Sequence, residues 1–212
     1  MKPAAETAPP VEGLLPARAL ALEIDALPAP TWSWLELGGR LVEVASGNGG
    51  AGHSAALVLV VDAQLRGEPC VWIGLEQRGL FPPDAEAAGV DLLALAFVRG
   101  KTTADLVRAA DLCARSGAFG LIVLDLAGFV PPLSTLSRLG GLARAHHTAL
   151  VLLSEKQPGS PSLGSFVSLR ADTRFERQRS GHFALHIEVD RDRRRTRPWR
   201  VTEPRRGPPG LS

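Results

Sequence analysis

Residues 40–54 read RLVEVASGNGGAGHS, and this stretch decides the fold. Its first part, Arg40–Ala45, alternates apolar and polar side chains, which is typical of a β-strand. A glycine-rich turn, Gly47–Gly52, follows at once, and Ser54–Leu65 then has the composition of a helix. A strand, a glycine-rich turn and a helix in this order bring backbone N–H groups and a helix N-terminus to one point. That arrangement predicts a cradle for a phosphate or another anion.

The turn has the spacing of a phosphate-binding loop, G-x-x-x-x-G-K-[ST], with one change. Ser54 stands where a hydroxyl group meets Mg²⁺, but His53 replaces the lysine. That lysine is a fixed positive charge on the terminal phosphates, whereas histidine, with an ordinary pKa of about 6.5, is mostly neutral at pH 7. Three interpretations remain open: a loop kept for its turn geometry, a nucleotide site without efficient turnover, and an active ATPase. The residues of this degenerate site are Gly47, Gly49, Gly50, Gly52, His53, Ser54 and Asp125.

Outward from the turn, apolar strands alternate with helices as far as residue 154. We expect strands at Pro69–Leu75, Leu92–Val98, Phe119–Leu126 and Thr148–Ser154, and helices at Asp84–Ala88, Thr102–Arg115 and Leu133–His147. Gly117 is the expected end of the middle helix. After a loop at Glu155–Gly164, antiparallel strands are expected at Phe166–Glu176, His182–Asp190 and Pro198–Thr202. The pattern predicts an α/β fold with a mixed, mainly parallel sheet flanked by helices and antiparallel strands at its C-terminal end.

Length and composition limit the class of protein. The chain has 212 residues, 45% of them hydrophobic, which suits one domain with tails. We assign residues 1–36 to a flexible arm, 37–203 to the domain and 204–212 to a disordered tail. No apolar run is long enough for a transmembrane helix, and the N-terminus lacks the pattern of a secretory signal. Cys70 and Cys113 alone cannot form a disulfide framework or a cysteine zinc site, so we expect no metal site and a cytoplasmic protein, with a nucleoid-associated location as the alternative.

The basic residues gather at the C-terminal end of the chain. Residues 170–212 carry 12 arginines and 6 acids, whereas the residues before them have a net charge of −4. Arginine forks match phosphate oxygens, and an aromatic ring between them can stack on a base. We therefore take this cluster as a candidate site for single-stranded DNA, with salt bridges inside the protein and an acidic protein partner as alternatives. Its members are Arg191, Arg193, Arg194, Arg195, Arg197, Arg200 and Trp199.

The segment ahead of the domain carries two tryptophans and a short apolar stretch. Trp32 and Trp34 have the spacing of one face of a strand. They either anchor the arm on the domain or dock a partner. The stretch Ala17–Leu27 needs another surface in order to be stable. The candidate docking residues are Leu20, Leu22, Ile24, Leu27, Trp32 and Trp34.

From Leu37 to Asp190 the sequence resembles the RecA recombinase core. Besides the glycine turn, the similar stretches are Val71–Glu76, Ala88–Leu93 and Arg115–Asp125. The resemblance implies that Glu76 stands where RecA places its water-activating glutamate and that Asp125 stands where it places the acid that holds Mg²⁺. It also implies that Ala17–Leu27 docks on a neighbouring subunit.

The chain departs from RecA where RecA binds DNA and senses nucleotide. The segment after Asp125 and the loop Glu155–Gly164 are both short, and Gln157 lies near, but displaced from, the position of the nucleotide-sensing glutamine. Together with His53, these differences predict a protein that has lost ATP turnover, for which no cofactor is expected. Mg-ATP binding is the alternative.

In size, core and basic end the chain is most similar to the ImuA-type accessory proteins. That resemblance implies support of mutagenic translesion synthesis after DNA damage. The implied partners are a RecA filament and a Y-family polymerase homologue or a replicative-type polymerase subunit, with no membrane involved. Two alternatives are a DNA-stimulated ATPase of the RecA class with an unusual loop and a cell-division inhibitor with a shortened RecA-like fold.

Overall fold

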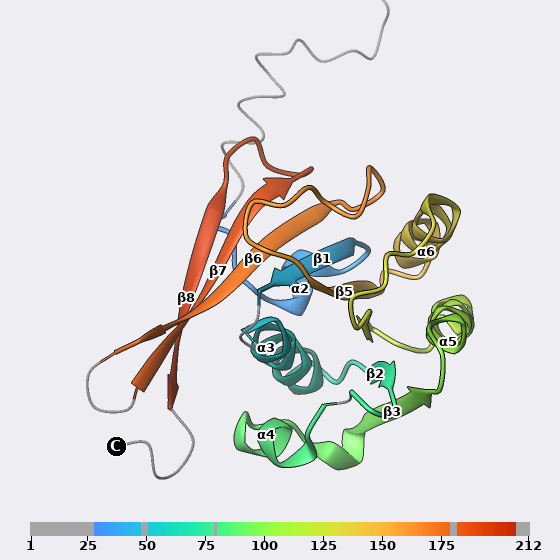
Figure 1. Ribbon diagram of the computed structural model, residues 1–212, viewed down its shortest axis with the longest axis horizontal. Helices are drawn as coiled ribbons and strands as arrows, with labels where there is room; N and C mark the ends of the chain where they lie inside the picture. The colour runs from blue at the N-terminus through green and yellow to red at the C-terminus, as the bar shows by residue number, and fades with distance from the viewer. Residues whose placement is uncertain (1–27, 48–50, 79, 179–181, 207–212) are drawn as a thin grey trace, which may run out of the picture.

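A computed structural model describes residues 28–47, 51–78, 80–178 and 182–206 (Figure 1). The segment Ala17–Leu27 and the loop residues Gly49 and Gly50 lie outside the described residues. Figure 1 shows a sheet with helices on both faces, whose last strands continue beyond the helices as a long antiparallel wing.

One eight-stranded sheet has the order β3-β2-β4-β5-β1-β6-β7-β8. The strands are β1 (Leu41–Ser46), β2 (Cys70–Leu75), β3 (Leu95–Gly100), β4 (Leu121–Asp125), β5 (Ala149–Glu155), β6 (Leu169–Arg177), β7 (His182–Asp192) and β8 (Trp199–Arg206). Neighbours from β3 to β6 run parallel, whereas β7 and β8 are antiparallel. The mixed sheet predicted from the sequence is therefore confirmed. The carboxyl ends of the parallel strands share one edge, which brings the glycine turn, Glu76 and Asp125 to the same edge of the sheet.

The helices are α2 (Trp34–Leu37), α3 (Ala51–Leu65), α4 (Pro82–Ala87), the 3-10 turn η1 (Leu92–Ala94), α5 (Thr103–Ser116) and α6 (Leu133–Ala145). Local signals fix α5 especially well. The Thr102 side chain and Asp105 cap each other's backbone N–H groups, and Gly117 ends the helix with a φ of 64°. A left-handed residue at this point strongly favours glycine.

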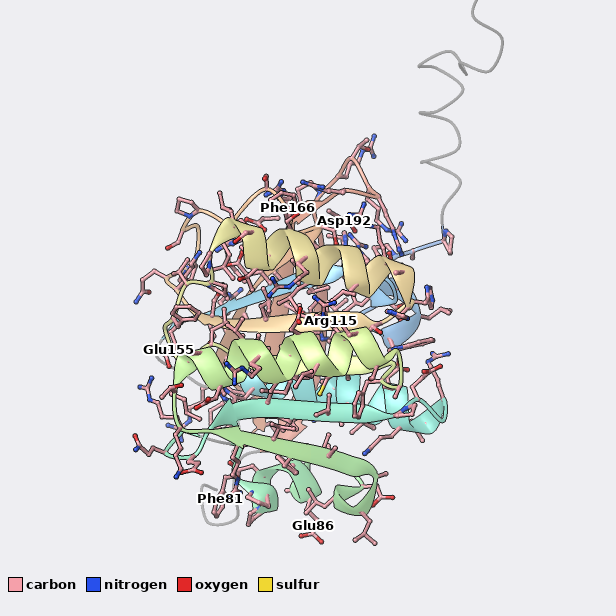
Figure 2. All side chains as sticks on the ribbon, turned by 90° about the vertical axis from the view of Figure 1, so that its right-hand side faces the viewer. Phe81, Glu86, Arg115, Glu155, Phe166 and Asp192 are labelled. Carbon is pink, nitrogen blue, oxygen red and sulfur yellow. The ribbon has the colours of Figure 1, made fainter. Side chains whose placement is uncertain are left out.

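Each face of the parallel strands has its own hydrophobic core. On one face α3 packs Leu59 and Val60 with the indole of Trp72 from β2. On the other face α5 and α6 contribute Leu106 and Leu136 to a second core. Figure 2 looks onto the face covered by α5 and α6. Continuous apolar strands are buried on both sides, as their sequence predicts.

Three expectations about local structure were wrong. The predicted strand Leu92–Val98 begins as η1, because the Asp91 carboxylate accepts a hydrogen bond from the Leu93 N–H and starts a turn. Trp32 and Trp34 do not share a strand face, since Trp34 opens α2 after a Ser33 cap. The chain also remains ordered in β8 beyond Glu203, because the strand pairs with β7 through Arg206. Among the described residues no helix is long and apolar enough to cross a membrane.

Candidate functional site

The two ends of the glycine turn that the structure describes pack closely against their surroundings. A Cβ atom on Gly52 would lie 2.9 Å from the Ser46 hydroxyl oxygen, so the first turn of α3 has room only for glycine there. Gly47 lies against Gln157, whose side-chain oxygen would be 3.4 Å from an added Cβ. The loop after β5 therefore borders the glycine turn, although Gln157 is displaced in the sequence.

The turn places His53 directly against the acid at the end of β4. The Nε2 atom of His53 lies 3.0 Å from Oδ2 of Asp125, and the imidazole stacks on Trp72 with ring centroids 5.7 Å apart. Asp125 is buried, and its Oδ1 accepts a hydrogen bond of 3.0 Å from the Ala127 N–H. Both carboxylate oxygens of Asp125 are thus engaged within the protein.

The other two residues expected at this site stay closer to solvent. Ser54 follows His53 on α3 and is half-buried, and Glu76 is exposed in the turn after β2. The backbone N–H of Glu76 donates to the Gly100 carbonyl, which fixes the turn. Within the described part of the chain neither side chain has a hydrogen-bonding partner. The structure therefore brings His53 and Asp125 into contact and leaves Ser54 and Glu76 beside them.

A buried carboxylate in β1 holds the loop after β5, and the sequence analysis did not single it out. Glu43 is fully buried and accepts hydrogen bonds from the hydroxyl of Ser162 at 2.7 Å and the N–H of Leu163 at 2.8 Å. It also accepts one from Ser154 and forms a 3.2 Å ion pair with Lys156. The signal that could have revealed it is an acid within an otherwise apolar strand, since an acid there needs partners.

Arg170 of β6 lies behind Glu43 and completes this buried charge network. Its guanidinium group is 2% exposed and pairs with Asp172 at 2.9 Å and Asp190 at 2.7 Å. Burial alone would lower the pKa of Arg170, but hydrogen bonds and charge from Asp172 and Asp190 leave the pKa above its ordinary value. Arg170 therefore stays charged inside the sheet.

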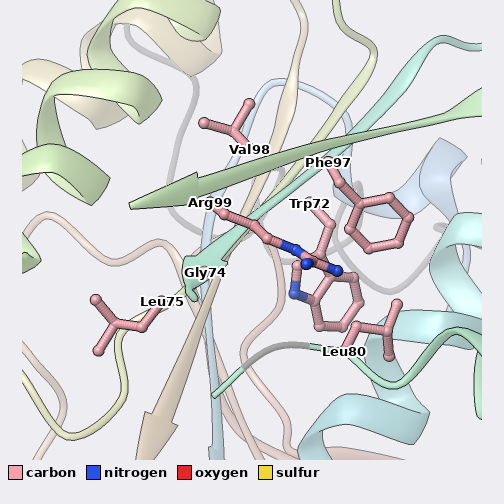
Figure 3. A pocket seen from close by; sticks show the side chains of 7 residues that line it. All are labelled: Trp72, Gly74, Leu75, Leu80, Phe97, Val98 and Arg99. Atoms are coloured by element: carbon pink, nitrogen blue, oxygen red, sulfur yellow. The ribbon is translucent and has the colours of Figure 1, made fainter. Parts of the chain in front are cut away.

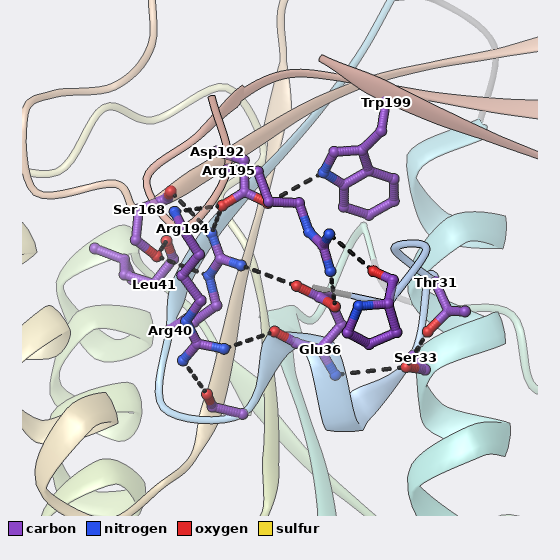
Figure 4. Close-up of polar contacts among 12 residues, drawn as sticks. Thr31, Ser33, Glu36, Arg40, Leu41, Ser168, Asp192, Arg194, Arg195 and Trp199 are labelled. Atoms are coloured by element: carbon purple, nitrogen blue, oxygen red, sulfur yellow. Dashed lines mark hydrogen bonds and ion pairs between the residues drawn. The ribbon is translucent and has the colours of Figure 1, made fainter. Parts of the chain in front are cut away.

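Two members of the arginine cluster hold residues 28–38, hereafter the N-terminal linker. Arg194 donates to the carbonyl oxygens of Glu36 and Gly38, each at 3.1 Å. Arg195 donates to the Pro28 carbonyl at 2.9 Å and to the Glu36 carboxylate at 3.1 Å. Figure 4 shows both guanidinium groups converging on this linker. The arrangement matches the alternative in which these arginines form contacts inside the protein.

Trp199 and Asp192 extend this group of contacts on the linker, which we call the linker clamp. The Trp199 indole N–H donates to Asp192 at 3.0 Å, and its ring lies 6.5 Å from the ring of Trp32. The Asp192 carboxylate also pairs with the buried Arg40 (Figure 4). Burial by itself would raise the pKa of Asp192, but hydrogen bonds from Arg40, Arg194 and Trp199 hold that pKa below its ordinary value. Burial and the nearby charge of Arg40 lower the pKa of Arg194.

The remaining arginines of the cluster differ in their surroundings. Arg193 donates to the Ser165 carbonyl, and Arg191 is half-buried. Arg197 and Arg200 are exposed and form no side-chain hydrogen bond or ion pair with any described residue. Of the predicted DNA-contacting set, these two are the most available on the wing.

Both linker tryptophans are anchored. Trp32 is 5% exposed and donates its indole N–H to the Ala55 carbonyl at 2.9 Å. Trp34 donates to the Gly120 carbonyl at 2.8 Å, and its ring packs edge-on against His147. This matches the interpretation in which the pair fastens the arm to the domain. In the described ranges no group of three or more His, Cys, Asp or Glu side chains could hold a metal ion.

Comparison with known proteins finds sequence similarity to RecA. No family model matches the chain. Over 136 residues it is 30% identical to RecA of Rubrobacter xylanophilus, which covers 61% of the chain and 39% of that protein. Over 131 residues it is 34% identical to RecA of Saccharopolyspora erythraea, covering 59% of the chain and 35% of that protein. The chain spans less than two fifths of the length of these relatives. The chain is thus an α/β protein that is similar to RecA over about three fifths of its own length.

Proposed function

We propose that this protein is an accessory factor in DNA-damage tolerance that acts as an adaptor without hydrolysing ATP. The contact between His53 and Asp125 is the observation that supports the loss of hydrolysis most strongly. A residue that should bind phosphate is instead bonded to the acid that should organise Mg²⁺. The similarity to RecA supports the DNA-related setting of the proposal.

The side chains at this site do not fit Mg-ATP hydrolysis. Phosphoryl transfer depends on positive charge placed on the terminal phosphates. His53 is shorter than lysine, and it shares its Nε2 with Asp125. Mg²⁺ would have to compete for an Asp125 carboxylate whose second oxygen already accepts from Ala127. Glu76 lies exposed in the turn after β2, and without a lysine on the terminal phosphates the attack of a water that it activates would lack charge stabilisation.

The adaptor part of the proposal rests on which surfaces remain available. A RecA filament and a Y-family polymerase homologue or replicative-type polymerase subunit are the proposed partners. Single-stranded DNA is the proposed ligand of the wing, through the exposed Arg197 and Arg200. Arg194 and Arg195 are left out of this DNA surface because they hold the linker.

Two measurements test the proposal together. Purified protein is sedimented with RecA filaments assembled on single-stranded DNA, and damage-induced mutagenesis is measured in host cells that lack the gene. We expect co-sedimentation with filaments, and restored mutagenesis by both the natural chain and His53→Lys. If the protein does not bind filaments and its absence leaves mutagenesis unchanged, the adaptor function is excluded. A block of cell division on overexpression, with normal mutagenesis, would favour the division-inhibitor alternative.

A DNA-stimulated ATPase is the second candidate. The exposed Glu76 and the retained Ser54 at the same sheet edge favour it. Glu76→Gln distinguishes the two functions. The substitution should abolish damage-induced mutagenesis in cells if the protein acts as an ATPase, and should leave it unchanged if the protein acts as an adaptor.

A further inference from the structure

The chain has four tryptophans, and the indole N–H of one of them bonds to no residue that the structure describes. Trp32 and Trp34 each donate to a backbone carbonyl, and Trp199 donates to Asp192. Trp72 is only 1% exposed, yet its Nε1 forms no hydrogen bond with any described residue. An unpaired buried donor loses its hydrogen bond to water without replacement, so such groups are rare and call for a physical explanation.

The Trp72 indole lies beside a hollow at the end of β2 and β3. Trp72, Gly74, Leu75, Leu80, Phe97, Val98 and Arg99 line it (Figure 3). A Cβ atom on Gly74 would lie 3.8 Å from Trp72 Nε1, so the missing side chain is what leaves space beside the donor. Glycine inside a strand often marks a place where another group approaches closely.

A second donor reaches the same space. Arg99 is the partner of Gly74 across the two strands, and Figure 3 shows its guanidinium group extending toward the Trp72 ring. Arg99 is exposed and forms no hydrogen bond or ion pair with a described residue. The side chains that line the hollow contain no acceptor group, and Leu80 and Phe97 give it an apolar wall. The hollow therefore suits an anionic oxygen carried on an apolar body.

We infer that this hollow, hereafter the Trp72 pocket, binds a carboxylate that lies next to an apolar side chain on a partner protein. The pocket is open at the sheet edge, unlike the deep cavities that enclose small molecules. Its surroundings are apolar, with Phe81, the neighbour of Leu80, 60% exposed and Phe97 36% exposed. Exposed apolar surface of this kind is typical of protein interfaces.

The apolar wall of the pocket favours a polypeptide over a nucleic acid. Leu80 and Phe97 line the pocket together with the two donors. A single carboxylate flanked by apolar groups would match both kinds of surface, whereas a polyphosphate backbone would set charge against the apolar wall. The Trp72 ring also stacks on His53, so the pocket borders the candidate site, and the inference goes beyond the proposed function because it assigns the pocket a ligand of its own.

The Trp72 indole provides its own readout in solution. Acetyl-Phe-Glu-Phe-amide is titrated into the full chain while the four indole N–H signals are followed by NMR. We expect the Trp72 signal to shift and those of Trp32, Trp34 and Trp199 to stay. The same peptide with Gln in place of Glu, hereafter the Gln peptide, should bind about tenfold more weakly, because it lacks the charge-assisted hydrogen bond.

Three variants assign the effect to the pocket. Gly74→Ala places a methyl group at ordinary contact distances of 3.7–3.8 Å, so the chain should still fold while the space beside Nε1 is filled. We expect Gly74→Ala and Arg99→Ala to weaken binding about tenfold or more. Lys101→Ala removes a nearby exposed charge outside the pocket and should bind normally.

Specific results would overturn the inference. It fails if the peptide at millimolar concentration leaves the Trp72 signal in place, or if the Gln peptide or Gly74→Ala binds as well as its counterpart. In a separate titration, inorganic phosphate replaces the peptide. A Trp72 shift with phosphate but not with the peptide would identify a phosphate site and contradict a protein partner.

Discussion

His53 lies 3.0 Å from Asp125, and this contact joins the first turn of α3 to the end of β4 across the edge of the sheet. Stacking of the imidazole on the buried Trp72 fixes the ring in that position. In a phosphate-binding loop these two positions serve the phosphate and the metal ion separately. Here they contact each other, and this contact is the basis of the proposal that the site does not hydrolyse ATP.

Replacing Glu43 should destabilise the fold strongly. Glu43→Gln leaves Lys156 and Arg170 without their shared buried carboxylate. Breaking a buried ion pair from one side typically costs about 3–5 kcal/mol, so we expect a loss of about 3 kcal/mol in urea unfolding. Glu188→Gln, at an exposed pair with Arg174, is the control and should change stability by less than about 1 kcal/mol. Equal effects of both variants would mean that Glu43 does not hold the network.

Removing the linker clamp should loosen residues 28–38 without unfolding the sheet. Arg195→Ala deletes the hydrogen bonds to Pro28 and Glu36. We expect faster hydrogen exchange in 28–38 and unchanged exchange in β4 and β5. Arg197→Ala, which removes an exposed arginine two positions away, should leave the linker protected. Unchanged protection in Arg195→Ala would show that Trp32 and Trp34 suffice to hold the linker.

The clamp also predicts a dependence of stability on pH. The pKa of Asp192 in the folded chain lies below its ordinary value of 3.8, so the unfolded chain binds this proton more readily. The contribution of Asp192 is therefore complete above the unfolded pKa and is lost as the pH falls through the folded pKa. We expect the stability difference between the natural chain and Asp192→Asn to be constant from pH 5 to 7 and to shrink below about pH 4. A difference that grows on acidification would contradict this sign.

If the wing binds single-stranded DNA, its two most available arginines should govern the salt dependence. Each phosphate contact on a single strand contributes about 0.7 to the slope of log K against log salt concentration. Arg197→Ala with Arg200→Ala should therefore reduce that slope by about 1.4. Arg144→Ala, an exposed arginine on α6, is the matched control. An unchanged slope in the double variant would exclude this part of the wing from DNA contact.

Most of the fold could be predicted because its signals are local. Apolar strands, the Thr102 cap and Gly117 each specify their element within a few residues. Strand order and the partners of buried charges are not local. Glu43 meets Ser162 and Leu163 only because β1 lies beside β5 and β6.

The candidate site could be predicted in part for the same reason. Spacing alone identifies the glycine turn and the missing lysine. That His53 turns to Asp125, and that Arg194 and Arg195 turn inward to the linker, depends on packing between distant segments. A run of arginines in a sequence does not reveal which members find acceptors within the fold.

The most direct test of the account is the rate of ATP hydrolysis by the purified full chain with Mg²⁺ and single-stranded DNA. Asp125→Ala, prepared in parallel, gives the background, since it removes the acid that would organise Mg²⁺. We expect the natural chain to show no turnover above the Asp125→Ala level. Turnover in the natural chain that is lost in both Asp125→Ala and Glu76→Gln would contradict it and establish an ATPase in which His53 replaces the lysine.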